Sequence, residues 1–101
     1  MRKQYKKIEG HLLLIDDLEL HGMVTGNITV PAGKTLLLHG MCCGSLIIEA
    51  GARASIEGTV SGDVLNSGFA EIGGTVNGNV RSRNGKVHFS ADCVIGGARD
   101  I

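Results

Sequence analysis

Residues 57–64 read Glu-Gly-Thr-Val-Ser-Gly-Asp-Val, and this stretch decides the fold because variants of it recur along the chain. Related copies begin at His21, His39 and Gly73, so the steps between copies are 18, 18 and 16 residues. A second set of glycines, at positions 33, 51, 68 and 85, keeps a similar step. A repeat of this length is typical of solenoids, in which each repeat forms one coil.

Apolar residues follow the same step. Within a copy they alternate with polar ones, as in Ala54-Ser55-Ile56, which is the period of β-strands. Glycine interrupts every window longer than about eight residues, and this disfavours helices. Coils stacked about 4.8 Å apart would bury each apolar column between them. The four columns are Val24, Cys42, Val60, Val76 and Cys93; Leu20, Leu38, Ile56, Ile72 and Phe89; Ile28, Leu46, Val64 and Val80; and Leu36, Ala54, Ala70 and Val87.

We therefore predict a single all-β domain, a β-solenoid of about five coils with a repeat of 16 to 18 residues. A basic N-terminal segment, residues 1–7, is expected to precede the β-helix domain, residues 8–101. No capping helix is expected at either end. Glycines at the corners would provide a positive φ or a close backbone approach. These structural corners are Gly22, Gly26, Gly40, Gly44, Gly58, Gly62, Gly74 and Gly78.

The charge, the short apolar run and the cysteine content limit which partners, location and cross-links we expect for this chain. Ten basic and ten acidic residues give a formal net charge of zero, so we expect no nucleic-acid partner. The apolar run Leu12–Ile15 is too short for a signal peptide or a membrane span, which favours a cytoplasmic location. Three cysteines give no disulfide framework and no Cys-x-x-Cys motif. Cys42 and Cys93 are interpreted as small core residues, and Cys43 is expected to point outward.

One outward column combines two imidazoles and a carboxylate. His21, His39 and Glu57 occupy equivalent places in three successive copies, a combination that could bind zinc. Because no fourth ligand and no orienting partner are evident, we interpret the column as a polar surface ladder and predict no metal site and no cofactor. No serine lies in a nucleophile elbow, and no glycine-rich segment has the phosphate-loop pattern. We expect no enzymatic activity, with a metal-dependent β-helix enzyme as a remote alternative.

The copies at 57–64 and 74–80 resemble those of the bactofilins, bacterial polymer-forming cytoskeletal proteins, and the resemblance covers residues 20–93. It implies a right-handed β-helix that associates end to end with itself into a cytoskeletal or scaffold assembly, without a bound nucleotide. It further implies that apolar residues of the terminal coils make the contacts. These self-association residues would be Leu12, Leu14, Leu18, Leu20, Val87, Phe89 and Ile95.

A second hypothesis is a small protein-binding module, such as an immunity protein that neutralises a bacterial toxin. The short chain and its balanced charge favour it. Met23 and Met41 would stack outward in neighbouring coils, where flexible methionine side chains suit a partner surface.

Overall fold

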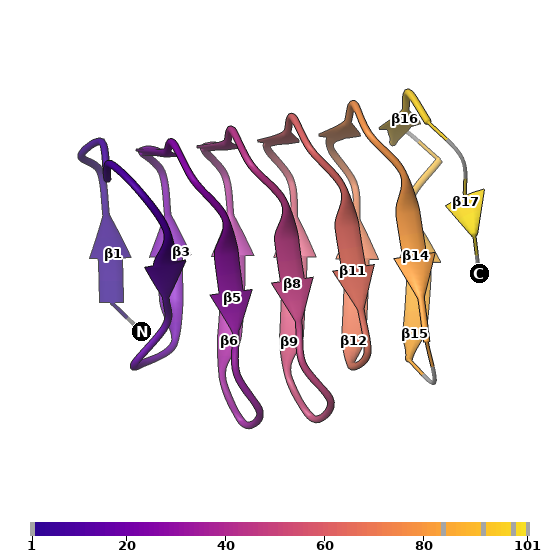
Figure 1. Ribbon diagram of the computed structural model, residues 1–101, viewed down its shortest axis with the longest axis horizontal. Helices are drawn as coiled ribbons and strands as arrows, with labels where there is room; N and C mark the ends of the chain where they lie inside the picture. Colours follow the sequence, from indigo (N-terminus) through magenta and orange to yellow (C-terminus); the bar gives the residue numbers. More distant parts are fainter. Residues whose placement is uncertain (1, 84, 92, 98, 101) are drawn as a thin grey trace.

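The computed structural model of the protein describes residues 2–83, 85–91, 93–97 and 99–100. It is an all-β solenoid of about five turns, as predicted, with parallel strands in three sheets. The coils stack along the longest axis of the molecule and the termini lie at opposite ends (Figure 1). The nearer strands run down and the farther strands run up as the chain advances from left to right, so the coil is right-handed (Figure 1).

Each turn after the first contributes one short strand to each sheet, and the strand pairs are parallel. The first turn has strands in sheets A and C and a single bridge, Ile8 to Val24, beside sheet B. Sheet A contains, in spatial order, β1 (Arg2–Gln4), β3 (Leu18–Leu20), β6 (Thr35–Leu38), β9 (Arg53–Ile56), β12 (Phe69–Ile72) and β15 (Lys86–Phe89). Sheet B contains β4 (Met23–Val24), β7 (Met41–Cys42), β10 (Thr59–Val60), β13 (Thr75–Val76) and β16 (Val94–Ile95). Sheet C contains β2 (Leu12–Leu13), β5 (Ile28–Val30), β8 (Leu46–Ile48), β11 (Val64–Asn66), β14 (Val80–Ser82) and β17 (Arg99–Asp100).

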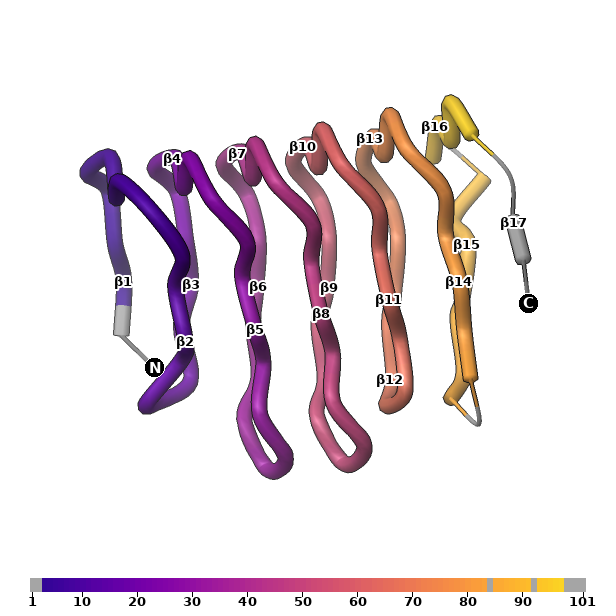
Figure 2. Tube along the Cα trace, in the orientation of Figure 1, coloured from indigo at the N-terminus to yellow at the C-terminus, as the bar shows by residue number. Residues whose placement is uncertain are grey.

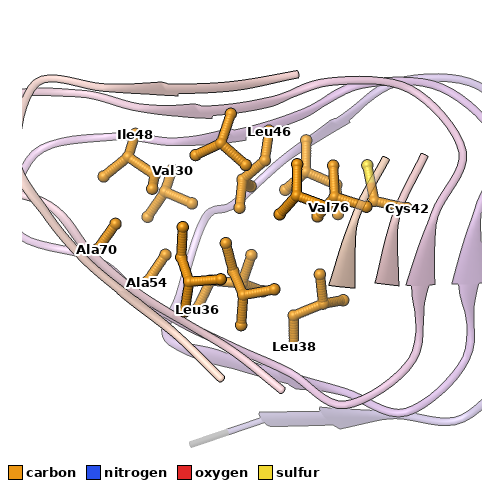
Figure 3. Close-up of a cluster of buried hydrophobic side chains, with 14 of the residues drawn as sticks. Val30, Leu36, Leu38, Cys42, Leu46, Ile48, Ala54, Ala70 and Val76 are labelled. Carbon is orange, nitrogen blue, oxygen red and sulfur yellow. The ribbon is translucent and has the colours of Figure 1, made fainter. Parts of the chain in front are cut away.

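The core is a continuous stack of aliphatic side chains that point inward from all three sheets (Figure 3). Buried and more exposed residues alternate along the strands, because successive side chains of a strand point to opposite faces. Three of the predicted columns pair in register throughout, and Cys42 stacks between Val24 and Val60 as expected. The side chain of Cys42 is fully buried, and this burial raises the pKa of its thiol.

In the remaining column, which starts at Val24, the last member was predicted wrongly. Ile95, and not Cys93, pairs with Val76 in sheet B. In the preceding coil Val76 follows Ile72 by four positions, whereas Ile95 follows Phe89 by six. A turn in which the amide of Cys93 donates to the carbonyl oxygen of Ser90, at 3.2 Å, takes up the two extra residues.

The eight corner glycines lie between strands and serve close backbone approach. A Cβ atom at any of them would stand less than 3.0 Å from a backbone atom of the preceding coil; for Gly62 that atom is the carbonyl oxygen of Gly44, at 2.7 Å. Positive φ occurs instead at Gly10, Gly33 and Gly51. Of the two reasons proposed from the sequence, close approach therefore applies to these corners.

The loops from sheet C to sheet A explain the uneven step of the repeat. Four residues follow β5 and β8, whereas only residues 67–68 connect β11 to β12, a visibly tighter turn (Figure 2). Asn66, only 2% exposed, closes this short corner. Its Nδ2 donates to the carbonyl oxygens of Gly68 (3.3 Å) and Lys86 (2.8 Å), and its Oδ1 accepts from the amide of Gly68 (3.1 Å).

At the corner between sheets B and C, polar side chains link successive coils. Asn27 Oδ1 accepts a hydrogen bond from the amide of Ser45, and Asp63 Oδ1 accepts one from the amide of Asn79, both at 2.8 Å. The ladder begins at His11, whose Nδ1 accepts from the amide of Asn27 at 2.9 Å. These bonds hold neighbouring coils together where the strands end.

The basic segment 1–7 contributes to the β-helix, because β1 pairs with β3 and forms the first strand of sheet A. In the part of the chain that the structure describes, no helix is long and apolar enough to cross a membrane.

Candidate functional site

Two members of the outward column predicted from the sequence, His21 and His39, form a stack of rings at the end of sheet A. The rings of His21 and His39 are parallel within 7°, with centroids 4.8 Å apart. Tyr5, from the coil before, stacks on the other face of His21 at the same distance. This spacing equals the distance between neighbouring strands, because each ring follows a paired strand of sheet A.

Glu19 lies beside this stack and contacts both histidines. Its Oε2 atom is 3.1 Å from Nε2 of His21, and its Oε1 atom is 3.8 Å from Nε2 of His39. The Nζ atom of Lys3 lies 3.6 Å from the same carboxylate. The hydrogen bond with His21 lowers the pKa of Glu19, and the charge of Lys3 acts in the same direction.

Glu57 follows His39 in the column, as predicted, but it contacts only this histidine. Its Oε2 atom lies 3.3 Å from Nδ1 of His39, on the side of the ring away from Glu19. The three side chains whose ligand atoms come together, within 4.8 Å of one another, are Glu19, His21 and His39. Glu57 therefore orients His39. The one-coil spacing that identifies His21, His39 and Glu57 does not include Glu19, which lies on β3 two positions before His21 and on the same face.

Among the described residues, no coil covers the N-terminal end of the solenoid. A cavity of about 250 Å³ lies there, in the first coil. Two exposed apolar side chains, Leu13 at 61% and Ile15 at 70%, stand at its border. Its remaining lining residues are Lys3, Gln4, Ile8, Leu12, Leu14, Asp16 and Leu18.

The C-terminal end also lacks a cover among the described residues. Val87 stacks on Ala70, and Ile95 stacks on Val76. The inner members of both pairs are fully buried, whereas Val87 and Ile95 are only half-buried. Strands β15, β16 and β17 are the edges of their sheets, since each pairs with a strand on one side.

The structure divides the predicted self-association residues into two groups. Leu14 and Leu20 are buried, Leu20 because β1 pairs over β3. The others lie half-buried at the two open ends, where a neighbouring molecule could reach them. They are Leu12 and Leu18 at the first coil and Val87, Phe89 and Ile95 at the last.

The remaining candidate groups are spread over the surface. Met23 and Met41 pair in register on the outer face of sheet B, and Met41 is exposed. Cys43 and Cys93 are half-buried. His88, on β15, lies outside the histidine stack.

Comparison of the chain with protein-family models, curated proteins and solved structures finds no match.

Proposed function

We propose that this chain is a structural protein that associates with copies of itself end to end, forming a bactofilin-like scaffold or filament. One observation carries the proposal: the apolar core of the solenoid reaches both ends of the molecule without a cover among the described residues. Apolar surface of this kind favours burial against a partner, and uncovered sheet edges favour backbone pairing.

The geometry of the sheets supports stacking along the axis. Sheets A and C have a strand in every coil, and sheet B has one in every coil but the first, where Ile8 forms a single bridge to Val24. Another copy placed against the C-terminal end can therefore extend all three sheets at once (Figure 1). Two associating ends on each chain permit growth beyond a dimer.

The size of the end face indicates a contact of moderate strength. Its dimensions of 25 × 22 Å offer at most roughly 550 Å² from each partner. Such a contact buries about 1,000 Å² in total, near the lower limit for a specific interface. Assembly is therefore expected to depend steeply on protein concentration.

Matched variants test the role of the ends. Ile15→Lys places a charge at the rim of the N-terminal cavity, on a side chain that is 70% exposed and contributes little to the fold. Leu65→Lys makes the same kind of change on the outer face of sheet C, in the middle of the stack. Sedimentation velocity of untagged protein should show oligomers for the wild type and for Leu65→Lys, and a shift to monomers for Ile15→Lys.

A second variant tests the opposite end. Val87→Lys directs a charge inward on an edge strand, a device that blocks edge pairing. Oligomers that survive both terminal variants and are lost in Leu65→Lys would refute the proposal. A wild-type chain that stays monomeric at every concentration would instead favour the binding-module hypothesis.

A further inference from the structure

We propose that Glu19, His21 and His39 form a binding site for a divalent transition-metal ion, with zinc as the best-fitting class. The inference does not depend on end-to-end association, because the three residues lie on the outer surface of the first full coils and not at an end face. Two imidazole nitrogens and a carboxylate oxygen are a ligand set suited to Zn²⁺.

The distances from Glu19 to the two histidine nitrogens are close to those of a tetrahedral site, and all three ligand atoms lie within 4.8 Å of one another. Metal bonds of about 2.0–2.1 Å place two tetrahedral ligands roughly 3.3 Å apart. The contacts of Glu19 with His21 and His39, at 3.1 and 3.8 Å, lie on either side of this value. Three protein ligands leave a fourth position for a water molecule.

Hydrogen bonding gives a second reason to place a cation here. Glu57, as a carboxylate, only accepts hydrogen bonds, so the 3.3 Å contact requires a proton on Nδ1 of His39. A neutral His39 then turns the bare lone pair of Nε2 toward Glu19, which is also an acceptor. A metal ion between Nε2 and Glu19 satisfies both, as does a second proton on His39, so the ion competes with a proton for this position. Glu57 would then act as the outer partner that fixes the tautomer and orientation of a metal-binding histidine.

Two adjustments accompany binding. The parallel rings of His21 and His39 must turn toward each other about χ2, because lone pairs in parallel planes do not meet at one ion. This torsion is soft in histidine, and both side chains are about one-third exposed, at 31% and 32%. Lys3, at 59% exposure, must leave Glu19, so its positive charge competes with the ion.

Isothermal titration of zinc chloride into metal-free, untagged protein tests the site. We expect one ion per chain with micromolar affinity. His21→Ala, His39→Ala and Glu19→Gln should each weaken binding by about 100-fold or more, since each removes a ligand. Lys3→Gln should strengthen binding, because it removes the competing cation. His88→Ala, an exposed histidine on β15, is the control and should leave the affinity unchanged.

Histidine ¹⁵N spectra provide a second measurement that does not rely on the variants. Zinc should shift the imidazole signals of His21 and His39 and leave those of His11 and His88 in place. The absence of saturable binding below millimolar zinc would overturn the proposal. So would binding that survives His21→Ala and His39→Ala but is lost in Cys43→Ser.

Discussion

Two adjacent glycines, Gly73 and Gly74, offer a sharp test of how the coils are held together. A Cβ atom at Gly74 would meet the carbonyl oxygen of Gly58 and lie 2.8 Å from both the carbonyl carbon and oxygen of Glu57. A Cβ atom at Gly73 would have only ordinary contacts, 3.7 Å from Ser90 Cβ and 3.8 Å from the carbonyl oxygen of Ile56. Neither glycine has a positive φ.

The structure sets the size of the expected effect. Alanine at Gly74 must push two coils apart, because the atoms in its way belong to hydrogen-bonded backbone that cannot rotate aside. Such overpacking costs about 1–3 kcal/mol. The shift also disturbs the hydrogen bonds from the amides of Gly74 and Thr75, both 2.9 Å, each contributing about 1 kcal/mol. We expect Gly74→Ala to lower the free energy of unfolding by about 3–5 kcal/mol.

The substitution Gly73→Ala should instead raise the free energy of unfolding. Gly73→Ala fits without strain and reduces the entropy of the unfolded chain, so we expect a gain of about 0.4–1 kcal/mol. Urea unfolding followed by far-ultraviolet circular dichroism measures both variants. Gly74→Ala should lower the midpoint by roughly 2 M, given the usual urea dependence of small proteins. Equal midpoints for the two variants would refute the explanation from close backbone approach.

Two further perturbations test the interior and the histidine stack. Asn66→Ala leaves the amide of Gly68 and the carbonyl of Lys86 without this buried partner, so thermal or urea unfolding should show a loss of about 2–3 kcal/mol; an unchanged stability would contradict the role of Asn66 in closing the corner. The lowered pKa of Glu19 means that its ionised form stabilises the fold near neutral pH and that this contribution disappears as the pH falls through the lowered pKa. The difference in melting temperature between the wild type and Glu19→Gln should therefore be largest near neutral pH and vanish in acid. A difference that grows on acidification would contradict a stabilising role of the ionised Glu19.

The regular part of the fold could be predicted from the sequence because each coil repeats the same constraints. The step from Leu38 to Ile56 and from Leu46 to Val64 places equivalent side chains in one column, and the structure confirms both pairings. Glycine spacing located the corners. It did not distinguish a positive φ from close approach, since that depends on how near the preceding coil lies.

The parts that the sequence could not predict depend on departures from the repeat. By its spacing and its apolar character, Cys93 fitted the inward column after Val76. The turn in which the amide of Cys93 bonds to the carbonyl oxygen of Ser90 lengthens the connection, so that Ile95 takes this place. The histidine cluster was found by its one-coil spacing. Glu19 lies two residues further from the corner than His21, and the side-chain directions that bring its carboxylate to the Nε2 atoms of both His21 and His39 are set by packing in three dimensions.

The most direct test of the central claim, association through the open ends, is electron microscopy of untagged protein over a concentration series. The account predicts rods that lengthen with concentration while their width remains that of one solenoid, 25 × 22 Å in section. Particles that remain single solenoids at the highest concentration would contradict it, as would assemblies that widen by contact between the outer faces of the sheets.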